Sequence, residues 1–387
     1  MAPGQAGAED GGLTLRRWSV AEWLDNEAAW NALLVRSRAD PLFLSWEWLT
    51  QWWRHFAAEL AATADILAFH RAGELVGVAP FYRRRLLRNG ILPASSVQLM
   101  GFAWRTGGTA MSEYLDVLAL DGEADAVRRA CASALLEEPG WNEWVIGFTA
   151  AGRCWCEAFS GPGRERRYMR DLDRSASYQA DLSSGFAGYL RSLGRSTRRS
   201  LWGLRRRLAV QAKVTFECLA GEEIDAAFCD LNRLHQLRWN RPAYVGSRLA
   251  FHTGLAKCLA GRGELAASRL RVGSEVVSVL YDIRKRGCQY NICMAYDPAF
   301  NSKVSLGLLH LGYAMEVAAE SQVVTYDLLA GGGQRSDYKR HLSQSSRNLS
   351  CVQVVRGHLL PALYRWRDRM RVSGASRPSL PGEVSAR

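Results

Sequence analysis

Hydrophobic and polar positions change their spacing twice between Gly287 and Leu342. From Gln289 to Met294 polar and apolar residues alternate, which is the two-residue period of a β-strand. After a turn-rich segment at 297–302, apolar residues recur at the spacing of a helix face: Leu306, Leu309, Tyr313 and Val317. A second apolar strand is expected over 323–329. The stretch therefore predicts a strand, a loop, a helix and a strand in succession.

The predicted helix opens with Ser305, Leu306 and Gly307. The first turn of a helix has N–H groups without partners and a partial positive charge, so it suits a pyrophosphate. A glycine there lets the backbone come close to a ligand, although close helix packing explains it equally well. With Lys303 just before it, this turn is a candidate phosphate site.

The first half of the chain predicts alternating strands and helices. The expected strands are 13–18, 66–70, 75–83, 97–102, 114–120 and 143–148. The expected helices are 20–36, 46–56 and 123–136. Ser45 is the predicted N-cap of the second helix, and Ala72-Gly73 predicts a hairpin turn. The segment 150–177 has no clear periodicity, so we expect it to be irregular.

Four tryptophans lie in or near the predicted helix 46–56: Trp46, Trp48, Trp52 and Trp53. They are either a stacking platform for a ligand or part of a hydrophobic core. Their helical spacing favours the core.

The second half predicts a strand at 178–182, an arginine-rich helix over 185–210, and helices at 224–239 and 250–260. Three strands follow between 265 and 296, joined by turns at Gly273-Ser274 and Lys285-Arg286-Gly287. After the stretch 287–342, a strand at 349–355 and a helix at 359–371 are expected. The arginine-rich helix is either a binding surface for an anion or a solvated helix face.

The two halves share a weak repeat. Residues 66–85 and 267–286 each contain an apolar strand, a basic residue, a glycine-bearing turn and a longer apolar strand with a basic end. We interpret this as two copies of one α/β unit. The predicted domains are 13–177 and 178–372, between disordered tails at 1–12 and 373–387.

Composition narrows the classes of function. The 387 residues are 48% hydrophobic and 23% charged, as in globular proteins, and no apolar run approaches the roughly 20 residues of a membrane span. The nine cysteines form no metal-binding pattern, so we expect reduced thiols, no metal and a cytoplasmic location, with the inner face of the membrane as an alternative. The net charge of +12 suits CoA, a nucleotide sugar, nucleic acid or anionic lipid.

Four segments carry a resemblance to a known family: 41–53, 189–208, 273–300 and 304–342. They resemble the tandem GNAT acyltransferases, including CelD-like and BioF2-like acetyltransferase domains, and more distantly the FemABX peptidyltransferases. The resemblance implies an α/β (α+β) fold with two GNAT-like domains, each a mixed, mostly antiparallel sheet flanked by helices. In the first half, Tyr114 and Asp116 lie in a similar strand without a following glycine loop, so we interpret the first domain as a degenerate copy.

In GNAT enzymes a Q/R-x-x-G-x-G/A loop binds the pyrophosphate of CoA. The corresponding segment here is 301–307, which has one glycine and no counterpart of the first Gln or Arg. The resemblance thus implies acyl-CoA as the donor, while an aminoacyl-tRNA, as in the FemABX relatives, stays open. No metal is implied.

The candidate site residues follow from these patterns. We assign the donor side to Asn291, Cys293, Lys303, Ser305, Leu306, Gly307 and His310. The acceptor side is assigned to His235, Trp239 and Tyr290. Asp327 is the candidate base, although it can equally cap the chain or pair with Arg335, Lys339 or Arg340. Tyr338 is either the proton donor or a packed core residue, and Lys339 either contacts substrate or phosphate or forms a surface salt bridge.

Three functions are compatible with the sequence. The first is transfer of an acyl group from acyl-CoA to an amine or hydroxyl of a small molecule or cell-envelope saccharide. The second is aminoacyl-tRNA-dependent peptidyl transfer of the FemABX kind. The third is a non-catalytic binding protein in polysaccharide biosynthesis. Oligomeric state does not follow from the sequence.

Overall fold

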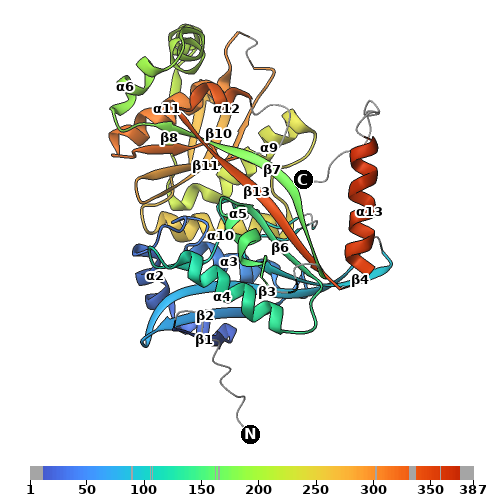
Figure 1. Ribbon diagram of the computed structural model, residues 1–387. Helices are drawn as coiled ribbons and strands as arrows, with labels where there is room; N and C mark the ends of the chain where they lie inside the picture. The colour runs from blue at the N-terminus through green and yellow to red at the C-terminus, as the bar shows by residue number, and fades with distance from the viewer. Residues whose placement is uncertain are drawn as a thin grey trace. The chain divides into compact units, whose positions relative to one another are not determined.

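The computed structural model describes residues 12–374, apart from 89, 105, 107, 162, 164–165, 301–302, 331–336 and 358. The predicted disordered tails lie almost wholly outside the described residues. The chain divides into two compact units (Figure 1): unit 1 is Met1–Ser175 with Leu349–Arg387, and unit 2 is Ala176–Asn348. These units are defined by contacts within the structure, and they do not test the predicted domains 13–177 and 178–372. The two divisions differ because the segment from Leu349 onward belongs to the same unit as the first half of the chain.

Unit 1 has a mixed, mostly antiparallel sheet with helices on it. Its strands are β1 (Leu13–Trp18), β2 (Thr63–Arg71), β3 (Glu74–Arg88), β4 (Leu92–Leu99), β5 (Leu118–Ala119), β6 (Glu143–Thr149) and most of β13 (Ser345–Arg356). The order is β1-β2-β3-β4-β6-β13, with β5 beside β3. Among the described pairings, β4 and β6 run parallel and the others run antiparallel. Its helices are α1 (Val20–Asp25), α2 (Glu27–Val35), α3 (Trp46–Phe56), α4 (Ala124–Glu137), α5 (Gly152–Ala158) and α13 (Leu359–Gly374).

Tryptophans form much of the unit 1 core, as their spacing predicted. Trp23, Trp30 and Trp46 pack edge to face, with ring centroids 5.3–6.2 Å apart. Buried indoles on α3 also have hydrogen-bond partners: Trp48 Nε1 donates to Ser112 Oγ at 2.7 Å. The helix α3 begins after Ser45, whose hydroxyl accepts from the backbone N–H of Trp48. These tryptophans therefore hold the fold together.

A buried ionic cluster attaches α13 to the unit 1 sheet. The carboxylate of Glu143 on β6 is fully buried and accepts from the guanidinium of Arg88 and the hydroxyl of Tyr364. Nearby, Arg170 forms an ion pair with Asp368 at 2.6 Å. Because α13 supplies both Tyr364 and Asp368, its place on the sheet depends on these polar contacts.

Unit 2 has the mixed, mostly antiparallel sheet expected of a GNAT-like unit. Its strand order is β7-β12-β11-β10-β9-β8, and only β11 and β12 run parallel. The strands are β7 (Arg167–Asp181, which begins in unit 1), β8 (Val214–Cys218), β9 (Ser268–Val272), β10 (Glu275–Lys285), β11 (Cys288–Tyr296) and β12 (Thr325–Asp327). The helices are α6 (Gly185–Ser192), α7 (Arg195–Arg198), the π-helix η2 (Arg199–Gly203), α8 (Arg205–Gln211), the 3-10 helix η3 (Gly221–Glu223), α9 (Ile224–Trp239), α10 (Gly246–Ala260), α11 (Leu306–Glu320) and α12 (Asp337–Leu342).

The arginine-rich segment is four short helices, whereas the sequence predicted one. Leu193 leaves the helical conformation with ψ 146°, and η2 is wound as a π-helix. A π-helical turn is rare and places the backbone differently from an α-helix. Here η2 packs on Gly312 of α11: a Cβ on Gly312 would lie 2.3 Å from the carbonyl oxygen of Leu201. The glycine therefore permits two helix backbones to touch.

Replacing Gly312 with alanine is expected to lower the free energy of unfolding of unit 2 by about 1–3 kcal/mol, because the methyl group meets backbone that no rotamer change can move aside. Thermal unfolding followed by circular dichroism measures the effect. Gly203→Ala is the matched control, since its nearest contact would be 3.6 Å away. Equal melting temperatures for Gly312→Ala and wild type would contradict the prediction.

Candidate active site

Strands β11 and β12 separate after a short parallel pairing. They pair at only three positions, the last of which joins Tyr290 to Asp327. On its other side β11 stays paired with β10 as far as Tyr296, with a bulge at Ile292. Within the described residues, the β11 edge from Asn291 to Tyr296 therefore faces no strand after the pairing ends. Its backbone N–H and C=O groups on that edge can bind a ligand.

We call the place where β11 and β12 separate the fork. A buried carboxylate that was not among the predicted site residues binds side chains from both strands there. Asp282 on β10 is fully buried and accepts from Gln289 Nε2 at 2.9 Å, from Asn291 Nδ2 at 2.7 Å and from the Tyr326 hydroxyl. Burial raises the pKa of Asp282 to about 6, while these hydrogen bonds act in the opposite direction. Because Gln289 and Tyr326 are register partners on β11 and β12, the carboxylate joins three strands where two of them separate. The only signal in the sequence is one acidic residue within an apolar strand.

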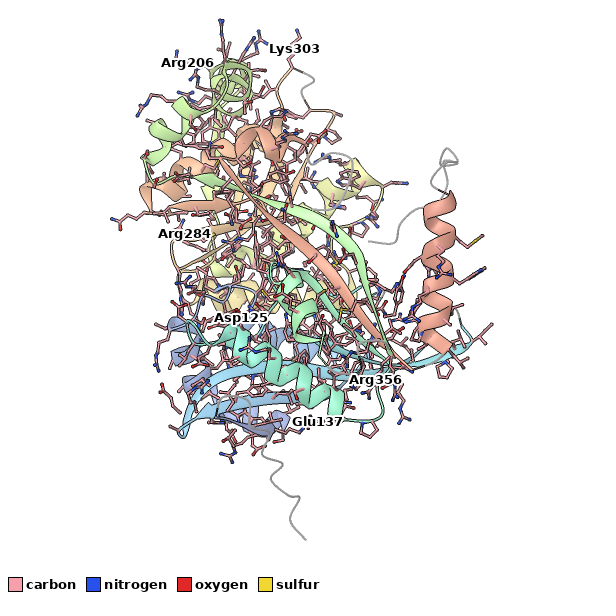
Figure 2. All side chains as sticks on the ribbon, in the orientation of Figure 1. Asp125, Glu137, Arg206, Arg284, Lys303 and Arg356 are labelled. Atoms are coloured by element: carbon pink, nitrogen blue, oxygen red, sulfur yellow. The ribbon has the colours of Figure 1, made fainter. Side chains whose placement is uncertain are left out.

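The first turn of α11 lies against the end of β11. Ser305 is the N-cap residue, and its side chain does not cap the helix. A Cβ on Gly307 would lie 2.7 Å from the ring of Tyr296 and 3.1 Å from Met294. Gly307 is therefore required by close packing, and the predicted Leu306 is buried behind it. Lys303 is exposed (Figure 2), and residues 301 and 302 of the predicted phosphate loop lie outside the described residues.

Asp327 and Lys339 are buried and hold the chain just after β12. Asp327 accepts from Gln179 Nε2 at 2.9 Å and from the backbone N–H of Leu329 at 2.7 Å. Lys339 on α12 donates to the carbonyl oxygens of Leu328, at 2.6 Å, and Leu329, at 3.2 Å. Both side chains thus fix the path of the backbone at the strand end.

Tyr338 lies among several candidate site residues. Its ring packs against the core, and its electrostatic neighbours are Arg238, Tyr296 and Cys293. Burial raises its pKa to about 12, so the hydroxyl is protonated at neutral pH. Among the described residues no hydrogen-bond partner contacts this hydroxyl.

His310 has a packing role in this structure. It is fully buried in α11, with Nδ1 2.8 Å from Ser278 Oγ and Nε2 3.0 Å from Ser268 Oγ. Both ring nitrogens are thus engaged between the helix and strands β9 and β10. Burial lowers the pKa of His310 to about 3, so the ring is neutral. Because both of its ring nitrogens are engaged, His310 is not among the residues that we propose to bind the donor.

The remaining predicted residues occupy two places. His235 and Trp239 lie at the end of α9, where His235 Nδ1 is 2.6 Å from the carbonyl oxygen of Arg241 and Trp239 is 45% exposed. Tyr290 is buried on β11, and Asn291 binds Asp282 rather than facing open space. Cys293 interacts with the Tyr244 hydroxyl, and burial raises the pKa of its thiol. No cluster of metal-binding side chains occurs in the described parts of the chain.

The buried His310 makes the stability of unit 2 dependent on pH. Its pKa is lowered from 6.5 to about 3, so the unfolded chain binds the proton more tightly. Stability from this group is therefore present above about pH 6.5 and is lost as pH falls toward 3, by at most about 1.4 kcal/mol per pH unit. Asp282, with a raised pKa, acts in the opposite direction.

Urea unfolding of wild type and His310→Gln between pH 7 and 4 isolates this effect. Glutamine can still hydrogen-bond both serines but does not titrate. We expect the wild type to lose stability more steeply than the variant as pH falls. Parallel stability profiles for the two proteins would contradict the assignment.

The chain is similar to a known protein family in sequence and to solved structures in fold. Residues 195–340 match the family model described as an acetyltransferase (GNAT) domain. No curated protein matches the chain in sequence. The crystal structure of FemX is similar, with a TM-score of 0.58 at 11% identity over 88% of this chain and 98% of that one. A tandem GNAT protein from the clavulanic acid biosynthesis pathway has a TM-score of 0.48 at 11% identity, over 89% of this chain and 99% of that one. L-PGS from Bacillus licheniformis has a TM-score of 0.48 at 10% identity, over 89% of this chain and 95% of that one.

The chain therefore has a fold like that of FemX, and its residues 195–340 match an acetyltransferase (GNAT) domain. The tandem GNAT fold with FemABX resemblance, expected from the sequence, is confirmed. The family model is described as an acetyltransferase domain, so acyl transfer is the class of activity that residues 195–340 support. No helix in the described ranges is long and apolar enough to cross a membrane.

Proposed function

We propose that this protein transfers an acyl group from acyl-CoA to an amine or hydroxyl of a small molecule or cell-envelope saccharide, in the cytoplasm or at the inner face of the membrane. The fork of β11 and β12 carries this proposal. It combines a strand edge that faces no described strand, the first turn of α11 and the Tyr338 hydroxyl, which no described residue bonds. The resemblance to CelD-like and BioF2-like acetyltransferases favours acyl-CoA as the donor.

The donor's pyrophosphate would lie at the first turn of α11, where the N–H groups of Leu306 and Gly307 have no intrahelical partner. The acyl thioester would then lie along the free edge of β11. A backbone N–H on the segment 290–294 would donate to the thioester carbonyl oxygen and stabilise the charge that develops on it. The bulge at Ile292 changes the direction of these groups along the edge.

In the reaction, the acceptor nitrogen or oxygen attacks the carbonyl carbon and the C–S bond breaks. Tyr338 gives its proton to the departing CoA sulfur. The nucleophile loses its own proton to water, and Tyr338 regains one from solvent. Its pKa of about 12 keeps Tyr338 protonated before the reaction, as an acid requires. Asp327 and Lys339 act as positioning residues, because their polar atoms hold the strand end that precedes α12.

Calorimetric titration with acetyl-CoA and longer acyl-CoAs tests the donor. We expect saturable binding that inorganic pyrophosphate weakens by competition. A folded protein that binds none of these thioesters would exclude the proposed donor.

One observation favours the second candidate, aminoacyl-tRNA-dependent peptidyl transfer. Between α7 and α8 the side chains of Arg195, Arg198, Arg199, Arg206 and Arg207 are exposed. Figure 2 shows Arg206 pointing away from unit 2. None of the five has a carboxylate partner within the described part of the chain, and a row of exposed guanidinium groups suits a phosphate backbone.

Filter binding of charged tRNA at increasing salt separates the two candidates. Peptidyl transfer requires affinity that falls steeply with salt and that weakens when Arg198 and Arg199 are both replaced by glutamine. Absence of tRNA binding even at low salt would remove this candidate.

A further inference from the structure

The end of α9 places an arginine between two aromatic rings. The guanidinium carbon of Arg238 lies 4.4 Å from the ring centroid of Tyr296 and 4.8 Å from that of Trp239. Both distances are typical of cation–π contacts, in which the cation lies over the face of an aromatic ring. Within the described residues, no carboxylate and no carbonyl oxygen contacts its N–H groups. The guanidinium thus has two aromatic neighbours and no hydrogen-bond acceptor among the described residues.

Two other arginines of unit 2, in contrast, have carboxylate partners for their guanidinium groups. Arg233, one turn earlier on α9, pairs with Asp230 at 3.4 Å and donates to the Val276 carbonyl at 3.0 Å. Arg269 on β9 pairs with Asp230 at 3.1 Å and with Glu223 at 3.4 Å. Arg238 is half-buried and has no carboxylate partner among the described residues, so its charge carries a desolvation cost that an anion would offset.

Tyr296 connects Arg238 to the first turn of α11. One edge of the Tyr296 ring would lie 2.7 Å from a Cβ on Gly307, and its face carries the Arg238 guanidinium. A single aromatic ring therefore separates the guanidinium from the start of the helix. Tyr338 is also an electrostatic neighbour of both Arg238 and Tyr296. Positive charge from the side chain and from the helix start thus gathers at one end of β11.

We propose that Arg238 binds a phosphate group of the donor substrate, together with the first turn of α11. This assignment rests on the proposed function for its placement at a donor site. A guanidinium presents two parallel N–H donors in a plane, the arrangement that binds a phosphate at two oxygens. Trp239 and Tyr296 fix its orientation before the ligand arrives, which lowers the entropic cost of binding.

The test uses calorimetry on the full chain with two probes, acetyl-CoA and inorganic pyrophosphate. Arg238→Gln is compared with Arg233→Gln, which removes the same charge from the same helix. Loss of a charge-assisted pair is expected to weaken both probes about 10- to 100-fold in Arg238→Gln. Arg233→Gln is expected to stay near wild type. Arg238→Lys keeps the positive charge but not the two parallel N–H donors, so we expect an intermediate loss of affinity. Melting temperatures verify that each variant is folded.

The possible results separate this inference from the proposed function. Unchanged acetyl-CoA affinity in Arg238→Gln would overturn the inference and leave the acyltransferase intact, and an equal loss in Arg233→Gln would do the same. Binding of pyrophosphate that depends on Arg238, without binding of any acyl-CoA, would support the phosphate site and reject acyl-CoA as donor. A wild type that binds neither probe would overturn both.

Discussion

Replacing Tyr338 with phenylalanine is expected to lower the turnover of acyl transfer about 10²- to 10⁴-fold, the usual contribution of a positioned acid. The change removes only the hydroxyl, and the ring keeps its packing against the core. Because no described residue bonds this hydroxyl, stability should change little. Release of CoA thiol from acetyl-CoA, measured with a panel of amines and saccharides, gives the turnover. Acyl-CoA affinity should stay near wild type.

Tyr313→Phe is the matched control, because Tyr313 is a half-buried tyrosine of the same unit whose ring stacks on Phe216. Its turnover should equal that of wild type. If Tyr338→Phe also kept full turnover, Tyr338 would have no role in proton transfer. If it kept the cellular function while the protein showed no turnover with any acceptor, a non-catalytic binding role would be favoured.

Replacing Glu143 with glutamine is expected to lower the free energy of unfolding of unit 1 by about 3–5 kcal/mol. The change leaves the Arg88 guanidinium, which is 8% exposed, without its carboxylate partner. Tyr364 keeps an acceptor but loses a charged one, so the attachment of α13 also weakens. Urea unfolding followed by tryptophan fluorescence measures this loss, because all 14 tryptophans except Trp202 and Trp239 belong to unit 1.

Two further variants define the cause. Glu157→Gln removes an exposed carboxylate paired with Arg153, and its effect should stay below about 1 kcal/mol. The double variant Arg88→Met with Glu143→Leu replaces the buried pair by apolar groups and should recover much of the lost stability. A loss in Glu143→Gln no larger than that in Glu157→Gln would show that the buried pair is not a source of stability.

The elements with strong periodicity were predicted well from the sequence. The hairpin turns at Gly73 and Gly273 have positive φ and join β2 to β3 and β9 to β10, as the weak repeat indicated. The segment 150–177 was predicted to be irregular, which was wrong: it contains α5 and most of β7. Strand β7 is rich in charged and polar residues, so it has no apolar alternation to detect. The helix expected at 20–36 is two helices, because the chain turns at Asn26.

The site was predictable in outline but not in its contacts. The sequence placed Gly307 at a helix start and Tyr338 near the end of a strand, because local spacing defines both. It could not show that Asp282 joins three strands or that Arg238 lies between two rings, since these contacts join residues far apart in the chain. The burial of His310 between two serines likewise depends on β9 and β10 lying under α11.

The discontinuity of unit 1 affects the order in which the protein folds during synthesis. Strand β13 pairs with β6, yet about 200 residues separate them in the chain. The ribosome therefore completes all of unit 2 before it supplies the strand that fills the unit 1 sheet. Until then the edge of β6 is uncovered and open to pairing with other chains. A fragment that ends near residue 177 retains this defect, whereas residues 176–348 contain a whole unit and form the better fragment for expression.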